Sequence, residues 1–203
     1  MIKAVFFDLE GVVLKNTRRT TELNIASLLG GTTKDLKRLW ARYRRPLLTG
    51  WLKAHQFSQL LDEQFNLEQG RGQQIWRQCY REGLTFDPVV LTVAHHLTRR
   101  GCIVGMLSNL MDESLVVIKD QPELKSFAPQ LFSCETRLMK PDLVTYKFAA
   151  ESVRCSPDEM MLIDDLPVNV GAALQAGWQA ITYVTGETDL VAELQRRNPS
   201  WSF

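Results

Sequence analysis

Two short apolar segments of this sequence end abruptly in acidic residues. The segments cover residues 5–7 and 160–163, and the acids that follow them are Asp8, Glu10, Asp164 and Asp165. Uninterrupted apolar runs of this length are typical of strands buried in a parallel sheet, and open α/β sheets bind ligands at the carboxyl ends of their strands. Acids at two strand ends predict one site for a hard divalent cation, since Mg²⁺ prefers oxygen ligands and usually shares its coordination shell with substrate phosphate.

Two further segments carry groups suited to an anionic substrate. Ser108 and Asn109 follow an apolar run over residues 103–107, and Lys140 follows a short predicted strand. A hydroxyl, a backbone N–H and an ammonium group are donors that can hold phosphoryl oxygens. Each residue type also has an ordinary structural interpretation: Ser108 as the first residue of a helix, Lys140 as a solvated surface lysine, and Asp165 as a helix cap.

Strands and helices alternate over most of the chain. Strands are predicted at residues 3–7, 103–107, 131–134, 160–163 and 179–184, and helices at 88–100, from 112, from 141, at 167–176 and at 190–197. Asp87 followed by Pro88 is a typical helix start, and Gly101 and Gly177 are typical helix ends. The alternation predicts an α/β fold with a Rossmann-like, doubly wound parallel sheet that helices cover on both faces.

The segment between the first predicted strand and Asp87 has no convincing strand pattern. Two sets of apolar residues recur in it at helical spacing: Leu36, Leu39, Trp40 and Tyr43, and then Phe57, Leu60, Leu61 and Phe65. We therefore predict two parts, a core domain over residues 1–15 and 86–203 and a small helical cap domain inserted at residues 16–85.

Four pieces of the sequence lie in the order of the motifs of one known family. They are Asp8-Leu9-Glu10-Gly11, Leu107-Ser108-Asn109, Lys140-Pro141-Asp142, and Ile163-Asp164-Asp165 with Asn169. Their order and chemistry resemble the haloacid dehalogenase-like (HAD) hydrolase superfamily, and in particular its phosphatase branch with a short helical cap after the first strand. The third and fourth pieces are similar to those of bacterial sugar-phosphate phosphatases and of the phosphatase domain of bifunctional epoxide hydrolases.

The resemblance implies a role for each acid. Asp8 would be the nucleophile and would form an aspartyl-phosphate. Mg²⁺ would bind the Asp8 carboxylate, the backbone carbonyl of Glu10 and Asp164, while Asp165 would hold metal-bound water or tune the site from behind the ligands.

The resemblance also implies which residues bind the substrate. Ser108, the backbone N–H of Asn109 and Lys140 would hold the phosphoryl oxygens. Arg45, at the end of a basic run, and Trp51 stand where caps of this type face the active site, so that either one could reach the leaving group. A solvated helix face is the alternative interpretation of the basic run.

Glu10 departs from the family pattern. Most phosphatases of this superfamily have aspartate there, which protonates the leaving oxygen and then activates water. Glutamate keeps the carboxylic acid and adds one methylene group, which changes its reach. Enolase-phosphatases resemble this chain in having Asp-x-Glu-Gly, so glutamate is compatible with hydrolysis.

The overall composition excludes several classes of protein. The 203 residues carry a net charge of +1, so no strong field favours nucleic acid or an anionic membrane. No apolar stretch approaches the ~20 residues of a membrane helix, and the first residues lack a signal-peptide pattern. The four cysteines form no CxxC and are predicted to be reduced thiols in or near the core. We therefore expect a cytoplasmic monomer or homodimer, with Trp201 and Phe203 of the tail packed on the body or on a second subunit.

The function predicted from the sequence is Mg²⁺-dependent hydrolysis of a small phosphorylated metabolite such as a sugar phosphate. The cap should open for the substrate and close over it. Three alternatives remain: a phosphomutase of the same superfamily, a dehalogenase, and a catalytically silent binding protein on the same fold. Glu10 and the paired acids disfavour the dehalogenase, because they suit a metal site that dehalogenases of this superfamily do not use.

Overall fold

A computed structural model describes residues 1–15 and 18–201 of the chain. Its centre is a five-stranded parallel sheet in the order β3-β2-β1-β4-β5. The strands are β1 Ala4–Phe7, β2 Ile103–Ser108, β3 Gln130–Phe132, β4 Met160–Asp164 and β5 Gln179–Thr182. In the register of the sheet, Phe7 at the end of β1 is level with Met106 of β2 and Ile163 of β4. The carboxyl ends of the three central strands therefore meet at one edge.

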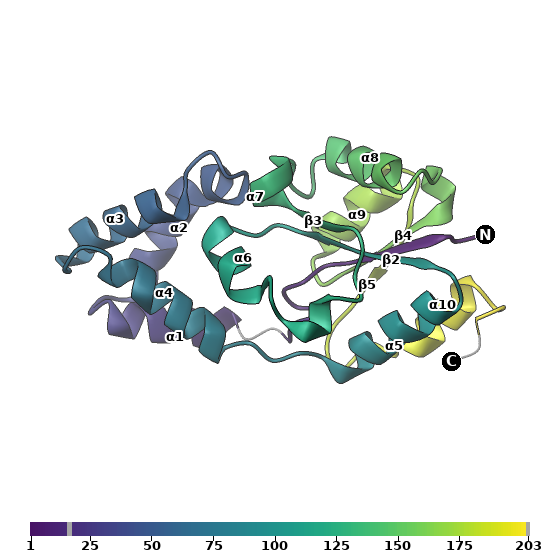
Figure 1. The fold of residues 1–203 in the computed structure, drawn as a ribbon, viewed down its shortest axis with the longest axis horizontal. Coiled ribbons are helices and arrows are strands. Elements are labelled where there is room, and N and C mark those ends of the chain that lie inside the picture. Colours follow the sequence, from purple (N-terminus) through teal and green to yellow (C-terminus); the bar gives the residue numbers. More distant parts are fainter. Residues whose placement is uncertain (16–17, 202–203) are drawn as a thin grey trace.

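Helices cover both faces of this sheet (Figure 1). They are α5 Pro88–Arg99 and α10 Leu190–Arg197 on one face, and α8 Leu143–Ser152 and α9 Pro167–Gln175 on the other. Val5 and Phe7 of β1 belong to the apolar core under α5 and α10, whereas Ala4 and Phe6 belong to the core under α8 and α9. Both faces of β1 are thus buried, which explains its unbroken apolar sequence. The predicted fold class is confirmed.

Four helices form a separate group at the carboxyl edge of the sheet, at the left of Figure 1. They are α1 Arg18–Leu28, α2 Thr33–Leu48, α3 Ala54–Phe65 and α4 Arg71–Glu82. Residues from all four helices, among them Phe57 and Ile75, form an apolar core of their own, which Met111 from the segment after β2 joins. We call this group the helical cap. Its core rests directly on the residues that follow β2.

Short elements complete the described chain. α6 Asp112–Ile118 follows β2, and α7 Ser133–Thr136 follows β3. Two 3₁₀ turns lie at Pro122–Leu124 and Pro157–Glu159. None of the helices in the described residues has the length and hydropathy needed to cross a bilayer.

The helix starts follow the sequence in one case and depart from it in another. Asp87 caps α5 by accepting a backbone N–H of the first turn at 3.0 Å, and Pro88 takes the first helical position, as predicted. The helix expected from Pro141 instead begins at Leu143, because the Asp142 N–H is held in the preceding turn.

Two predicted strands are shorter than expected. The strands predicted over residues 131–134 and 179–184 end at Phe132 and Thr182. The first strand ends because Ser133 Oγ accepts the N–H of Leu110, in the segment after β2, and a short helix begins at Ser133. The second stops because the N–H of residue 184 is bound by a threonine hydroxyl four residues further on.

The aromatic tail packs on the body of the protein where it is described. Trp201 is buried among residues of the core under α5 and α10. The Arg100 guanidinium donates to the Ser200 carbonyl at 3.1 Å and ties the tail to the end of α5. Phe203 lies outside the described residues.

The cysteines are free thiols at the positions that the structure describes. Cys79 and Cys134 are buried, and Cys102 and Cys155 are partly buried. Burial raises the pKa of Cys134 to about 12 and that of Cys102 to about 11, so both remain neutral thiols near pH 7.

Gly105, in the middle of β2, makes room for an aromatic ring. A Cβ atom at this position would lie 2.5 Å from the Phe6 ring of the neighbouring strand. The Phe6 ring in turn packs against Trp178, with ring centroids 5.9 Å apart. The Phe6 ring therefore lies between Gly105 and Trp178 and has little room to move away from an added methyl group.

We expect Gly105→Ala to lower the free energy of unfolding by about 1–3 kcal/mol, because an extra methyl group overpacks the core. Gly171→Ala in α9 is the matched control, since a Cβ there meets nothing within 4 Å. That variant should be about 0.4–1 kcal/mol more stable than the wild type through lower unfolded-state entropy. Urea denaturation followed by circular dichroism measures both, and equal stability of the two variants would contradict the packing argument.

Candidate active site

Asp8 stands directly after the central strand, at the carboxyl edge of the sheet. Its backbone N–H extends the ladder by donating to the Ile163 carbonyl at 2.9 Å. Its side chain is turned so that Oδ1 accepts the Leu9 N–H at 2.7 Å and lies 3.1 Å from Lys140 Nζ. The carboxylate is thus fixed in orientation by a backbone donor and an ammonium group, and only 6% of the residue is exposed.

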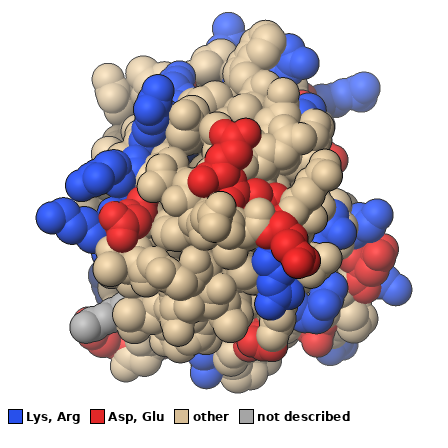
Figure 2. Space-filling model, turned by 90° about the vertical axis from the view of Figure 1, so that its left-hand side faces the viewer, with Lys and Arg blue, Asp and Glu red and all other residues tan. Residues whose placement is uncertain are grey.

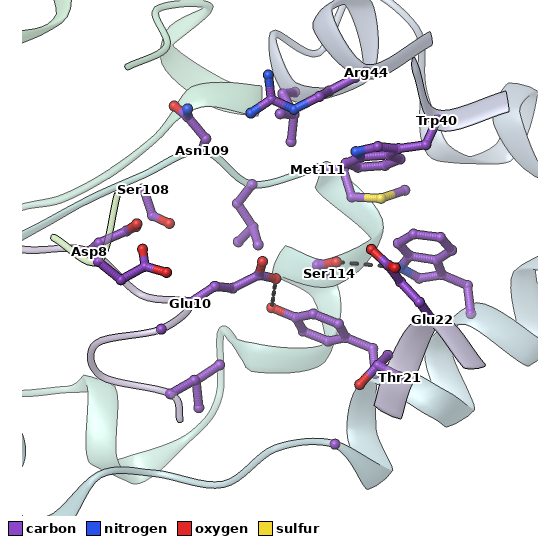
Figure 3. A pocket seen from close by; sticks show the side chains of 18 of the residues that line it. Asp8, Glu10, Thr21, Glu22, Trp40, Arg44, Ser108, Asn109, Met111 and Ser114 are labelled. Atoms are coloured by element: carbon purple, nitrogen blue, oxygen red, sulfur yellow. Dashed lines mark hydrogen bonds between the residues drawn. The ribbon is translucent and has the colours of Figure 1, made fainter. Parts of the chain in front are cut away.

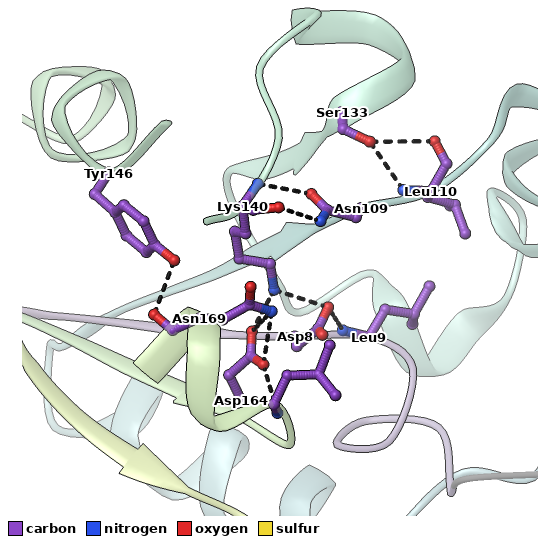
Figure 4. Close-up of polar contacts among 10 residues, drawn as sticks. Asp8, Leu9, Asn109, Leu110, Ser133, Lys140, Tyr146, Asp164 and Asn169 are labelled. Carbon is purple, nitrogen blue, oxygen red and sulfur yellow. Dashed lines mark hydrogen bonds and ion pairs between the residues drawn. The ribbon is translucent and has the colours of Figure 1, made fainter. Parts of the chain in front are cut away.

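Lys140 joins the ends of β1 and β4 (Figure 4). Its ammonium group is buried and lies 2.5 Å from Asp164 Oδ2 as well as 3.1 Å from Asp8 Oδ1. The surface interpretation of this lysine is therefore wrong. Although burial by itself lowers the pKa of Lys140, the carboxylates of Asp8 and Asp164 raise it, and the net shift is upward. Lys140 accordingly stays charged at neutral pH.

Asp164 is surrounded by donors. Its two oxygens accept hydrogen bonds from Lys140 Nζ at 2.5 Å, from Asn169 Nδ2 at 2.9 and 3.1 Å, and from the Leu166 N–H at 2.9 Å. A carboxylate offers about four acceptor directions, and these contacts engage both of its oxygens. Tyr146 in turn holds the Asn169 carbonyl at 2.9 Å, so that the asparagine is itself fixed.

Asp165 lies against the turn that follows β1. A Cβ on Gly11 would come within 2.4 Å of Asp165 Oδ2, and Gly11 has a φ of +86°. Both the left-handed backbone and the close approach require glycine at this position. Asp165 also lines the cavity described below. The acid pair therefore divides, with Asp164 enclosed by protein donors and Asp165 turned to the cavity.

Asp8, Asp164 and Asp165 together have the donor chemistry for a divalent cation. Each offers an oxygen within 4.8 Å of the others. Three carboxylates with one ammonium group leave two negative charges in the cluster, which a divalent cation would balance. Burial raises the pKa of Asp8 to about 7, against the attraction of Lys140 and together with the repulsion of Asp164. A cation beside Asp8 would oppose that shift and favour the ionised carboxylate.

Asn109 holds the backbone at Lys140, and Ser108 is hydrogen-bonded to Asp8. The Asn109 amide donates to the Lys140 carbonyl at 2.8 Å and accepts the Lys140 N–H at 2.9 Å. This reciprocal pair fixes the backbone from which the ammonium group extends. Ser108 is buried, and its hydrogen bond with Asp8 lowers the pKa of that carboxyl against the effect of burial. The sequence did not reveal the role of the Asn109 side chain, which depends on a residue 31 positions away.

A cavity of about 140 Å³ extends from this cluster to the helical cap. Its polar end is formed by Asp8, Glu10, Ser108, Asn109 and Asp165, and its cap side includes Trp40, Arg44 and Trp76. Figure 3 shows Glu10 between Asp8 and the residues of the cap. The cap therefore faces the carboxylate cluster across this cavity.

Glu10 is bound by a residue of the cap. The Tyr80 hydroxyl of α4 donates to Glu10 Oε1 at 3.0 Å (Figure 3). Burial raises the pKa of Tyr80 well above its ordinary value, and the neighbouring carboxylate of Glu10 adds to the shift, so that the hydroxyl stays protonated and remains a donor. The sequence does not predict the contact of Tyr80 with Glu10, because 70 positions separate the two residues.

Arg45 and Trp51 do not line the cavity. Arg45 points to the body instead and lies 2.8 Å from Asp142 Oδ2. Trp51 is 66% exposed, with the Arg137 guanidinium over its ring. The residues of α2 and α4 that line the cavity instead include Trp40, Arg44 and Trp76. Of these three, only Trp40 belongs to the apolar helical pattern predicted from the sequence.

The comparison with known protein families decides which family carries this arrangement. The family described as haloacid dehalogenase-like hydrolase matches residues 2–177. The chain belongs to this family. The predicted membership of the HAD superfamily is confirmed, and the protein is a hydrolase of this superfamily.

This chain is similar in sequence or in fold to several known proteins. The chain is 25% identical over 194 residues to (S)-2-haloacid dehalogenase 4A of Burkholderia cepacia, covering 89% of this chain and 82% of that protein. A HAD family enzyme of Bacteroides thetaiotaomicron has the same fold at a TM-score of 0.82 and 20% identity, covering 95% and 98% of the two chains. The Bacteroides protein has also been crystallised with magnesium and inorganic phosphate, and that structure matches at a TM-score of 0.77. A HAD-like hydrolase of Porphyromonas gingivalis matches at 0.82, with 20% identity and coverage of 98% of both chains.

The two acids at the end of β4 should respond differently to substitution. Asp165→Asn should weaken Mg²⁺ binding by at least about 10-fold with little change in stability, because this acid faces the cavity. Asp164→Asn should instead lower the free energy of unfolding by about 3 kcal/mol, because Lys140 loses a buried charged partner.

Calorimetric titration with Mg²⁺ and thermal unfolding of the metal-free proteins separate the two effects. Asp158→Asn, at an exposed position before β4, is the control for loss of one negative charge. A larger loss of Mg²⁺ affinity in Asp164→Asn than in Asp165→Asn would contradict this division of roles.

Proposed function

We propose that this HAD hydrolase cleaves small phosphate monoesters with the help of Mg²⁺, through an aspartyl-phosphate on Asp8. The observation that carries the proposal is the buried contact of Lys140 with both Asp8 and Asp164, next to the further carboxylate of Asp165. A charged donor beside an oriented carboxylate is what attack on an anionic phosphoryl group needs, since the two anions otherwise repel each other.

Asp8 attacks phosphorus, and the bond from phosphorus to the leaving oxygen breaks. The Leu9 N–H and Lys140 hold Oδ1 and so fix the direction from which the carboxylate approaches. Ser108 and Lys140 hold the phosphoryl oxygens. Bound Mg²⁺ would supply positive charge to the same oxygens, and the residues suited to hold it are Asp8, Asp165, the Glu10 carbonyl and Asp164.

Glu10 protonates the leaving oxygen and then accepts a proton from the water that hydrolyses the aspartyl-phosphate. Tyr80 holds the Glu10 carboxyl at 3.0 Å and is a positioning residue for this step. The longer side chain of glutamate, compared with aspartate, extends to the Tyr80 hydroxyl of the cap. Closure of the cap and placement of the acid are thereby connected.

The likeness to a haloacid dehalogenase of Burkholderia cepacia favours the dehalogenase alternative. The carboxylate cluster counts against it, since three acids within 4.8 Å are suited to a cation and phosphate chemistry. A phosphomutase would use the same residues, and burst kinetics with a requirement for a bisphosphate would reveal it. A silent binding protein would have no need for a buried, charge-balanced nucleophile.

The proposal is tested by hydrolysis of para-nitrophenyl phosphate with Mg²⁺ and with EDTA. We expect turnover that EDTA abolishes and that Asp8→Asn lowers by at least about 10³-fold, since a nucleophile cannot be replaced by an amide. Asp158→Asn, an exposed acid before β4, should keep the wild-type rate. Turnover of the Asp8→Asn protein at the wild-type rate would exclude the aspartyl-phosphate.

The role of Tyr80 is tested by Tyr80→Phe, with Tyr43→Phe, another tyrosine of the cap that does not line the cavity, as the control. We expect kcat for an alkyl phosphate to fall about 10-fold, a part of the 10²–10⁴-fold that a positioned acid contributes. The effect on para-nitrophenyl phosphate should be much smaller, because nitrophenolate leaves without protonation. Equal losses for both substrates would mean that Tyr80 only supports the structure.

A further inference from the structure

Apolar residues make up a large part of the cavity wall. They come from the helical cap (Ile25, Leu36, Trp40, Leu48 and Trp76) and from the rest of the chain (Leu14, Leu84, Leu110, Met111 and Leu166). The cap also contributes the polar residues Thr21, Glu22, Lys37, Arg44 and Tyr80; of these, Lys37 and Glu22 pair with each other at 3.5 Å, and Tyr80 donates to Glu10. The part of a substrate that extends away from Asp8 therefore meets mostly hydrocarbon and ring surface.

Two tryptophans form the most distinctive part of this wall. The rings of Trp40 and Trp76 are stacked, with centroids 5.9 Å apart and an angle of 20° between their planes. Phe57 packs edge-on against both, at 6.4 and 6.1 Å. The indole N–H of Trp76 donates to Ser114 Oγ at 3.4 Å, so its single donor is engaged within the protein. Trp76 therefore presents ring surface to the cavity.

The position of Glu10 decides which part of the substrate meets this wall. Glu10 lies between Asp8 and Trp40 (Figure 3). The leaving oxygen has to be near Glu10 to receive its proton, and the carbon skeleton of the alcohol then extends past Glu10 toward the cap. The apolar wall is therefore the binding site of the leaving group.

The stacked rings of the wall favour an aromatic group there. The cavity measures about 140 Å³ in all, including its polar end at Asp8, so that only a compact group fits beside the phosphoryl group. A stacked ring wall favours a flat partner. A polyhydroxylated sugar would instead bury some of its hydroxyl groups against the tryptophan rings and aliphatic side chains of the wall, which is unfavourable.

We propose that the natural substrate is the phosphate monoester of an aromatic alcohol, and that Trp40 and Trp76 select it. This inference rests on the proposed phosphatase function and departs from the sugar phosphate expected from the sequence. The phosphoryl group lies against Asp8, Ser108 and Lys140, while the ring of the alcohol packs on the wall of the cap.

The test compares benzyl phosphate with glucose 6-phosphate. Both are esters of primary alcohols, so their leaving groups differ little in acidity and the binding site decides the ratio. We expect kcat/KM to be at least about 10-fold higher for benzyl phosphate, and this preference to fall at least about 5-fold in Trp40→Ala and Trp76→Ala. Trp40→Leu and Trp76→Leu retain apolar volume and keep the test valid if the alanine variants do not fold. Phe148→Ala, an exposed aromatic residue on α8, should keep the full preference.

A binding measurement separates this inference from the chemistry. Benzylphosphonate and methylphosphonate have no hydrolysable ester, and calorimetry in Mg²⁺ should give an affinity at least about 10-fold tighter for the benzyl compound. Glucose 6-phosphate turnover equal to or above that of benzyl phosphate, or equal affinities for the two phosphonates, would overturn the inference while the phosphatase function stands. Tighter binding of benzylphosphonate without turnover of either ester would support the aromatic site and refute the phosphatase function.

Discussion

The ammonium group of Lys140, buried between Asp8 and Asp164, is the interaction on which the rest of the site depends. Taking three charged groups out of water is costly, and their mutual contacts at 2.5 and 3.1 Å, together with the hydrogen bonds that the two carboxylates accept, offset that cost. Without the ammonium group, two carboxylates would repel each other inside the protein. The hold of Asn109 on the Lys140 backbone and the hold of Asn169 on Asp164 keep this contact in place.

The helical cap is tied to the body at residues that adjoin the site. Its contacts join Tyr80 to Glu10, Arg45 to Asp142, the Ala54 N–H to Asp112, Trp76 to Ser114, and both Gln73 and Arg77 to Glu113. Each partner in the body lies within a few residues of Asp8, Ser108 or Lys140 in the sequence. A movement of the cap would therefore displace the segments that carry the charged groups. Such an arrangement is expected when closure of a cap completes an active site.

The two ends of the cavity differ in character. Carboxylates gather at the sheet edge, while the cap contributes the two tryptophans and aliphatic side chains beside a few polar ones. Figure 2, which views the molecule from the side of the cap, shows charged side chains on the outer surface there. Apolar surface keeps water away from charges and so strengthens their interactions. In the proposed reaction the same wall would distinguish between leaving groups and support the chemistry at Asp8.

The sequence by itself determined the parallel sheet and the polar end of the site. Each of Asp8, Ser108 and Asp164 ends a short apolar run, and parallel strands bring their carboxyl ends to one edge whatever the details of packing. The cap was decided only in three dimensions. Neighbouring residues on a helix point about 100° apart, so that Arg44 lines the cavity while Arg45 reaches Asp142. An apolar helical pattern likewise does not tell which tryptophans face a substrate, or that Tyr80 meets Glu10, because those contacts depend on how the helices pack together.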